Sequence, residues 1–247
     1  EKAIENYTKA IALDSNYWQA YSNRAYMYQS LEDYDKALED YTSAIDLDKE
    51  NPERYDDRAV CYSAMEDYTN ALKDLDKAIE LAPEDPNYYN QRADFYKDQE
   101  NYDEALKDYA TVIEISTDDY ETTRAINNRA LIFGVQENYT LQVEEYTKAI
   151  AISPKALYYS NRGLTYDDLE DYEKALADFT MAIELDKEDP ELYLYRADCY
   201  LAMEKYTDAL KDYDKAIDLA PENTEYLNNR ADFYKDQENY DEALKDY

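Results

Sequence analysis

The stretch Arg92–Tyr109, RADFYKDQENYDEALKDY, occurs a second time, letter for letter, as Arg230–Tyr247, 138 residues further along the chain. Within each copy, alanines and aromatic residues recur three and four positions apart on both sides of the polar segment KDQEN. This spacing places them on one face of a helix. The stretch therefore predicts two amphipathic helices joined by a short turn, and its repetition predicts a chain built from such pairs.

A shorter period of 34 residues runs through the whole chain. In residues 18–51, Ala25 and Tyr28 mark a first helix, and Ala37 and Tyr41 mark a second. The predicted units are a half repeat at 1–17, repeats at 18–51, 52–85, 86–122, 123–155, 156–189 and 190–223, and a truncated repeat at 224–247. Because residues 52–85 match residues 190–223 at 24 of 34 positions, we infer that a four-repeat block was duplicated at the 138-residue spacing.

The 34-residue period is interrupted at one place, which we call the seam. Residues 120–122 are additional to the 34-residue unit and precede the repeat 123–155. The same repeat has Gln142 where its neighbours have alanine. We expect a local irregularity in the stacking of repeats at this point.

The recurring aromatic and small residues resemble the tetratricopeptide repeat family, whose 34-residue helix–turn–helix pattern has the same residue types at these slots. The resemblance covers the whole chain. It implies an all-α fold, an α-solenoid of helix–turn–helix repeats forming a right-handed superhelix. Proteins of this family commonly bind extended peptides in a concave groove lined by the first helices.

The composition argues against several classes of function. A formal net charge of −33 leaves no basic face for nucleic acid. No apolar run is long enough to span a bilayer, so no membrane insertion is expected. The chain has no histidine, no closely spaced cysteine pair and no glycine-rich phosphate loop, so we predict no metal, no cofactor and no catalytic residue. Cys61 and Cys199 are expected to be buried and unpaired. No signal peptide is visible, and both a cytoplasmic and a secreted location fit the sequence.

An arginine stands one residue before the small residue of every first helix, and an acid follows it sixteen residues later, in the second helix. This spacing can bring the two side chains together, so we predict an ion pair that fixes the register of the two helices. The half repeat has no first helix, and its acid slot holds the neutral Asn6. The predicted pairs are Arg24–Asp40, Arg58–Asp74, Arg92–Asp108, Arg129–Glu145, Arg162–Asp178, Arg196–Asp212 and Arg230–Asp246.

The groove-facing slots indicate the charge of a ligand. Asparagines that could bond a peptide backbone are Asn23, Asn128, Asn161 and Asn229. Most other slots hold acids, namely Glu53, Asp56, Asp57, Asp94, Glu191, Asp198 and Asp232, whereas the basic exceptions are Lys97, Arg124 and Lys235. The chain therefore matches only in part the subclass of the family that clamps a terminal carboxylate, and we expect any groove ligand to be neutral or basic.

Tyrosine, with 31 copies, fills four predicted core slots per repeat, where its ring buries a large area and its hydroxyl can reach a turn. A second group outside these slots gives candidates for an exposed aromatic binding ladder, namely Tyr26, Tyr88, Tyr158, Tyr195 and Tyr226. The sequon Asn138-Tyr139-Thr140 falls in a predicted turn, so Asn138 is a candidate glycosylation site if the protein is secreted.

Three functions fit these observations. The leading one is a non-enzymatic scaffold that mediates protein–protein contacts as part of a longer array or a larger assembly. The second is a structural subunit of a head-to-tail filament, because the chain begins with a lone second helix and ends inside a copy of an internal segment. The third is a peptide receptor that uses the concave groove. The expected partners are neutral or basic proteins and peptides, or other copies of the chain end to end.

Overall fold

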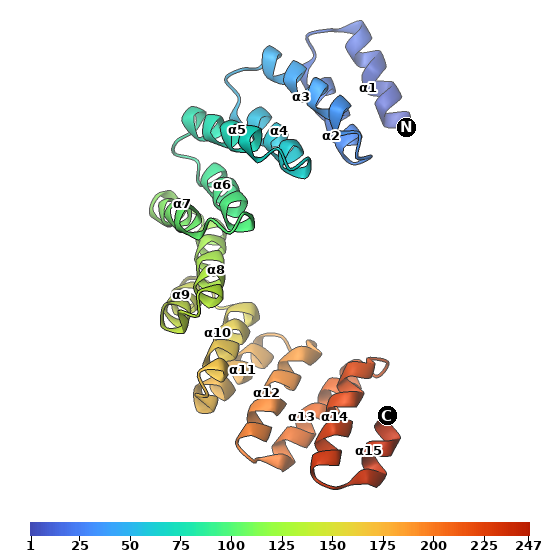
Figure 1. The fold of residues 1–247 in the computed structure, drawn as a ribbon, viewed down its shortest axis with the longest axis vertical. Helices are drawn as coiled ribbons and strands as arrows, with labels where there is room; N and C mark the ends of the chain where they lie inside the picture. Colours follow the sequence, from blue (N-terminus) through green and yellow to red (C-terminus); the bar gives the residue numbers. More distant parts are fainter. The chain divides into compact units, whose positions relative to one another are not determined.

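The computed structural model describes all residues from Glu1 to Tyr247 and contains fifteen α-helices and no β-strand. The all-α class predicted from the 34-residue period is confirmed, as is the construction from helix pairs (Figure 1). The chain divides into two compact units, Glu1–Ala125 and Ile126–Tyr247. No helix combines the length and the apolar composition that a membrane span requires.

The half repeat contributes one helix, and each later repeat contributes a first helix and a second helix. The helices of the first unit are α1 (Lys2–Leu13), α2 (Trp18–Gln29), α3 (Tyr34–Leu47), α4 (Pro52–Ala64), α5 (Tyr68–Leu81), α6 (Pro86–Asp98) and α7 (Tyr102–Ile115). α8 (Asp119–Val135) begins in the first unit and ends in the second. The second unit continues with α9 (Tyr139–Ile152), α10 (Ala156–Asp168), α11 (Tyr172–Leu185), α12 (Pro190–Ala202), α13 (Tyr206–Leu219), α14 (Thr224–Asp236) and α15 (Tyr240–Asp246).

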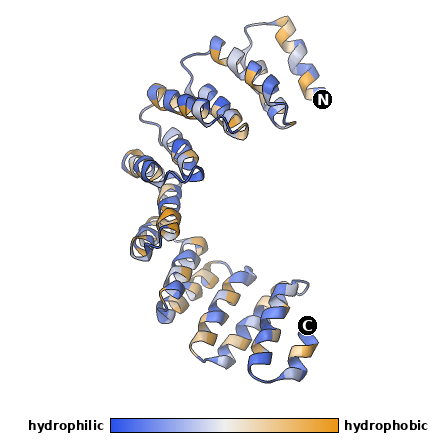
Figure 2. Ribbon diagram, viewed as in Figure 1, coloured by the Kyte–Doolittle hydropathy of each residue, from blue (hydrophilic) through white to orange (hydrophobic).

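Packing within each unit follows the order of the chain. In the first unit α2 packs on α3, α4 on α5 and α6 on α7, and the second helices α3 and α5 also contact the next first helix. The second unit repeats this arrangement from α9 to α15. Nearly every helix in Figure 2 carries both apolar and polar residues. This mixture is expected of helices that bury one face against their neighbours. Each repeat therefore contacts only its neighbours, which defines a solenoid.

Small residues allow the two helices of a repeat to approach closely. The alanines that follow the paired arginines, such as Ala25 and Ala93, are fully buried. Gly163 takes this place in one repeat, and a Cβ atom there would lie 2.8 Å from Cε1 of the buried Phe179 ring. The glycine is explained by this close approach, because a contact below 3.0 Å would force the ring to move.

The turns between first and second helices have one unusual backbone feature. In every repeat that has a first helix, a glutamate adopts the left-handed conformation, with φ between 56° and 60°. The seven residues are Glu32, Glu66, Glu100, Glu137, Glu170, Glu204 and Glu238. This conformation costs an ordinary L-residue roughly 1–2 kcal/mol, whereas glycine adopts it freely. Each turn therefore holds a residue that is not optimal for its backbone.

The predicted seam takes a specific form. α8 begins at Asp119 and is 17 residues long, so Tyr120–Thr122 form part of its first turns instead of extra residues before a helix. The carboxylate of Asp118 accepts a hydrogen bond of 2.6 Å from the Tyr120 amide, which starts the helix early. Further along, Gln142 fills space opposite Gly134, where a Cβ atom would lie 2.6 Å from Nε2 of Gln142. A glycine on one helix thus accommodates the glutamine that replaces alanine on the other.

Candidate functional site

Six of the seven predicted arginine–acid pairs are bidentate in the structure. Nε and Nη2 of each arginine donate to the two carboxylate oxygens over 2.7–2.9 Å. The pairs brought together in this way are Arg24–Asp40, Arg58–Asp74, Arg92–Asp108, Arg162–Asp178, Arg196–Asp212 and Arg230–Asp246. The acids are the more buried partners, since Asp74 is only 3% exposed. Hydrogen bonding to the acid raises the pKa of each arginine, so the arginine is held in its charged form.

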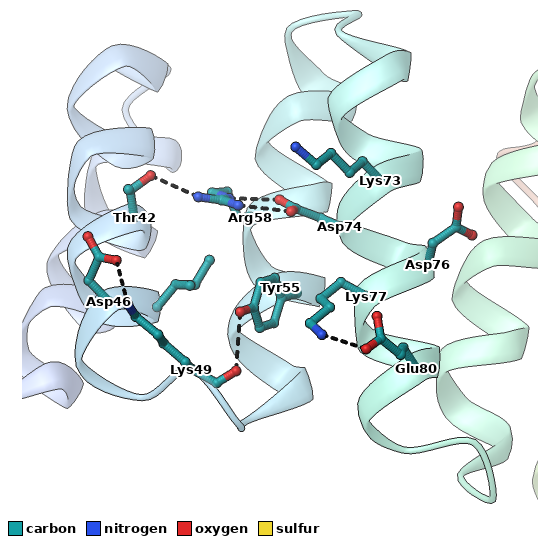
Figure 3. A pocket seen from close by; sticks show the side chains of 11 residues that line it. Thr42, Asp46, Lys49, Tyr55, Arg58, Lys73, Asp74, Asp76, Lys77 and Glu80 are labelled. Carbon is teal, nitrogen blue, oxygen red and sulfur yellow. Dashed lines mark hydrogen bonds and ion pairs between the residues drawn. The ribbon is translucent and has the colours of Figure 1, made fainter.

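A third contact of these arginines reaches the preceding repeat. Figure 3 shows Arg58 between Asp74 of its own repeat and Thr42 of α3, whose hydroxyl accepts from Nη1 over 3.0 Å. The corresponding acceptors for the other arginines are Thr8, Asp76, Thr147, Thr180 and Asp214. Each of these six arginines therefore joins three helices. This contact was not predicted from the sequence, although the signal was present as a threonine or aspartate two residues after the acid slot.

The fourth repeat has a looser version of the pair. Nη2 of Arg129 lies 3.4 Å from Oε1 of Glu145, and Lys148 also binds this oxygen, over 2.7 Å. Nε of Arg129 and Oε2 of Glu145 are buried without a hydrogen-bond partner. The longer glutamate side chain thus replaces the bidentate contact with a single weak one.

The cavity drawn in Figure 3 has a volume of about 580 Å³ and lies between α3, α4 and α5. Most of its charges are matched within the chain: Lys77 contacts Glu80 over 2.8 Å, and Asp76 accepts from Arg92. Elsewhere in the structure, no group of three or more histidine, cysteine, aspartate or glutamate side chains is placed to hold a metal ion.

A second cavity, of about 460 Å³, lies on the other side of α4, between α4 and α6. We call it the α4–α6 groove. Val60, which is 49% exposed, and Phe95 provide apolar surface, and Tyr68 of α5 also lines the groove. The remaining lining residues are Asp56, Ala59, Ser63, Leu75, Gln91, Asp94, Asp98 and Gln99. The groove therefore combines apolar contacts with three acids.

Among the three acids of the groove, Asp56 is the one with a buried oxygen that has no hydrogen-bond partner. Its Oδ1 is buried and has no partner, whereas the Gln91 side chain hydrogen-bonds the carboxylate. Burial, together with the neighbouring charge of Asp57, raises the pKa of Asp56 to about 6. The same slot of the adjacent repeats holds Ser22 and Asn90, and each of them also has a buried side-chain oxygen without a partner. Asn127 of the next repeat has the same feature, so the slot leaves an unpartnered oxygen in four successive repeats. The sequence indicated the acid at this slot, but not these unpartnered oxygens.

The predicted basic groove residues have acidic partners within the chain. Nη2 of Arg124 donates to Asp94, and Nζ of Lys97 lies 3.6 Å from the same carboxylate. Tyr109 donates its hydroxyl to Asp94 as well. Lys235 likewise contacts Asp232. The acids of the groove neutralise these cations, which the spacing in the sequence alone could not reveal.

The four candidate asparagines are distributed over both units. Asn23 lies on α2 and is exposed, whereas Asn128, Asn161 and Asn229 are partly buried on α8, α10 and α14. The side chain of Asn161 is hydrogen-bonded to the hydroxyl of Tyr146. Binding of a peptide backbone by these residues stays a prediction.

The exposed tyrosine ladder is wrong as predicted. Tyr158 and Tyr226 are buried, at 4% and 5% exposure, and Tyr88 and Tyr195 are partly buried. Only Tyr26 of this group is exposed, at 60%. The hydroxyls of the first-helix tyrosines do reach turns, since that of Tyr55 donates to the Lys49 carbonyl over 3.1 Å.

Asn138 and the two cysteines occupy simple structural positions. Asn138 is exposed at the start of α9, where its side-chain oxygen accepts from the Leu141 amide over 3.3 Å. It therefore caps the helix, and its glycosylation stays a prediction. Cys61 and Cys199 are free and buried, as predicted.

Asp56 is expected to make the stability of the protein depend on pH. Because the folded state raises its pKa above the ordinary 3.8, to about 6, it contributes stability at low pH that is lost as the pH rises toward neutrality. Asp56→Leu is therefore expected to increase the free energy of unfolding by roughly 1–3 kcal/mol at pH 7. The increase should shrink by about 1 kcal/mol when the pH is lowered to 5.

Urea unfolding followed by circular dichroism at pH 5, 6 and 7 measures this dependence. Asp98→Asn is the control, because it removes an exposed acid from the same cavity. A difference between Asp56→Leu and the unmodified protein that stays constant over this pH range would contradict the account.

Comparison with known proteins identifies the repeat. Models of the tetratricopeptide repeat match residues 18–51, 52–85, 156–189 and 190–223, and further matches cover 75–107 and 212–245. Together they span well over half of the chain. The chain belongs to the tetratricopeptide repeat family. Repeats of this family support a role as a scaffold for protein–protein interaction.

Curated relatives share a short segment of sequence with this chain. DnaJ homolog subfamily C member 7 of Mus musculus is 39% identical over 69 residues, which is 26% of this chain and 14% of that protein. Its counterpart from Homo sapiens is 38% identical over the same length, with the same shares of both chains. The chain therefore matches a small part of these curated relatives.

Solved structures with the same fold extend over most of the chain. The C-terminal part of a tetratricopeptide repeat protein from Cytophaga hutchinsonii has a TM-score of 0.73 and 21% identity, covering 90% of this chain and 92% of that structure. YrrB, described as a tetratricopeptide repeat protein with an unusual peptide-binding site, has a TM-score of 0.59 and 21% identity, with 77% and 97% covered. MamA has a TM-score of 0.57 and 18% identity, with 65% and 87% covered. At these identities the likeness establishes the solenoid fold.

Proposed function

We propose that this chain is a non-enzymatic scaffold that binds an extended segment of a partner protein in the α4–α6 groove. The observation that carries the proposal is the groove itself, in which the exposed Val60 and the half-buried Phe95 lie beside acids in a volume of about 460 Å³. Pockets that combine apolar surface with a few placed polar groups are typical binding sites. The description of YrrB as a peptide-binding protein of the same fold supports a similar use here.

The charge of the protein favours neutral or basic segments as ligands. With 59 acidic and 26 basic residues, the chain attracts cationic partners and repels anionic ones at low ionic strength. The cations predicted to face the groove are bound to its own acids, as the contacts of Arg124 and Lys97 with Asp94 show. A ligand therefore meets an acidic and apolar surface.

A panel of random peptides displayed on phage tests the function and does not require the partner to be identified first. Peptides enriched on the purified protein are synthesised, and their affinity is measured by isothermal titration calorimetry. We expect micromolar binding that is lost in Val60→Arg, because the new side chain fills the apolar part of the groove.

Leu185→Arg is the matched control. Leu185 ends α11 in the second unit and is 49% exposed, like Val60, so the substitution adds the same charge outside the groove. It should leave the affinity unchanged. Peptides that bind Val60→Arg as tightly as the unmodified protein, or a panel that yields no binder, would refute the groove as the binding site.

A further inference from the structure

We propose that the α4–α6 groove selects a segment with a lysine or arginine side chain, whose cation pairs with Asp56 while neighbouring apolar side chains contact Val60 and Phe95. This inference rests on the proposed function, because it specifies the ligand of the same groove. The inference assigns the choice of ligand to one residue, Asp56. It also explains why the first of the two duplicated blocks selects a cation and the second does not.

Asp56 lacks what a cationic ligand would supply. A carboxylate oxygen buried without a partner is costly, and a cation that donates hydrogen bonds removes this cost. Within the chain, Oδ1 of Asp56 has no donor, and its neighbours on α4 include the acids Glu53 and Asp57. The only help comes from the neutral amide of Gln91 on α6.

The other two acids of the groove are not equivalent to Asp56. Asp94 is bound by Tyr109, Arg124 and Lys97, so its charge is already neutralised. Asp98 is exposed at the end of α6, where water screens it. A ligand cation therefore gains most at Asp56, with Asp98 adding to the attraction of the rim.

The second copy of the duplicated block shows the alternative. Leu194 stands 138 residues after Asp56 and is buried, and the acid has moved to Asp198, at the position that corresponds to Val60. There the hydroxyl of Tyr213 donates to Oδ1 of Asp198 over 2.7 Å. The first copy has Leu75 in place of this tyrosine. In the second copy, Asp198 therefore accepts a hydrogen bond from within the chain. In the first copy, Asp56 keeps an oxygen without a donor.

Two short peptides test the inference. The probe is acetyl-Gly-Leu-Gly-Lys-Gly-Val-Gly-amide, and its analogue has norleucine in place of lysine, which keeps a similar side-chain length but removes the charge. Binding is followed by chemical-shift changes of Val60 and Phe95. We expect the unmodified protein to bind the lysine peptide about tenfold more tightly than the norleucine peptide, the size expected of a charged hydrogen bond at a partly buried site.

Two substitutions assign the preference to Asp56. Asp56→Leu, which copies the second block, and the nearly isosteric Asp56→Asn should both bind the two peptides within about twofold of each other. Asp98→Asn should keep most of the preference. Equal binding of both peptides by the unmodified protein, or a preference that survives in both Asp56 variants, would overturn the selection of a cation while leaving the groove as a binding site. If neither peptide moves the Val60 or Phe95 resonances, the proposed function itself fails along with the inference.

Discussion

Replacing Arg92 by leucine is expected to lower the free energy of unfolding by about 3–5 kcal/mol. The arginine is the donor for both oxygens of Asp108, a carboxylate that is 6% exposed, and for Asp76 of the preceding repeat. Its removal leaves one acid buried without a counter-charge and breaks a contact between repeats. A buried charge without a partner is among the few causes of losses this large.

The double variant Arg92→Leu with Asp108→Leu separates the ion pair from simple packing. Because no charge is left buried, the double variant should be more stable than Arg92→Leu alone, and close to the unmodified protein. Urea unfolding followed by circular dichroism gives the three free energies. A double variant that is no more stable than Arg92→Leu alone would show that the two residues do not act as a pair.

Arg129→Leu is the matched control within the chain. Its acid, Glu145, keeps a partner after the substitution, because Lys148 binds the same oxygen over 2.7 Å. The original contact is also longer, at 3.4 Å. We therefore expect a smaller loss than in Arg92→Leu, and an equal or larger loss would contradict the description of this pair as loosened.

Replacing the left-handed glutamates of three turns by glycine is expected to stabilise the protein by about 2 kcal/mol in total. Glu66, Glu100 and Glu204 have φ between 58° and 60°, a conformation that costs an L-residue roughly 1–2 kcal/mol. Glycine removes this cost but loses more entropy on folding, by about 0.4–1 kcal/mol. The net gain is about 0.5–1 kcal/mol per turn.

Thermal unfolding of the single, double and triple glycine variants measures this gain. The midpoint should rise with each substitution, because the three turns are in different repeats and their effects add. Glu39→Gly in the middle of α3 is the control, since there the glycine should lower stability by about 0.5 kcal/mol. A triple variant that unfolds at or below the temperature of the unmodified protein would contradict this account of the turns.

The helix pairs and the arginine–acid pairs could be predicted from the sequence because both depend on regular spacing. A period of 34 residues fixes which residues share a helix face, and a separation of sixteen residues repeated in every unit places Arg92 and Asp108 opposite each other. These relations depend only on the geometry within one repeat, which is the same in every repeat. They therefore do not change with the way one repeat packs on the next.

Contacts between repeats could not be predicted in the same way. The bond from Arg58 to Thr42 and the capture of Arg124 by Asp94 depend on how one helix pair sits on its neighbour. The predicted exposure of Tyr158 was wrong for the same reason, because its slot is covered by packing that the period does not encode. The early start of α8 depends on a local cap by Asp118, which competes with the regular unit.

The α4–α6 groove could be predicted from the sequence only in part. The acidic character of the first-helix face was visible in the sequence, and Asp56 was among the acids assigned to it. Its unpartnered oxygen was not visible, because that depends on which side chains of α6 reach it. The structure thus singles out one acid among several that look alike in the sequence.

A crystal structure of the protein with the lysine peptide bound is the most direct test of the central claim. We expect the peptide in the α4–α6 groove, with the ammonium group about 3 Å from an oxygen of the Asp56 carboxylate and the apolar side chains against Val60 and Phe95. A peptide bound to the face formed by α3 and α5, or a lysine in the groove that points away from Asp56 into solvent, would contradict the claim.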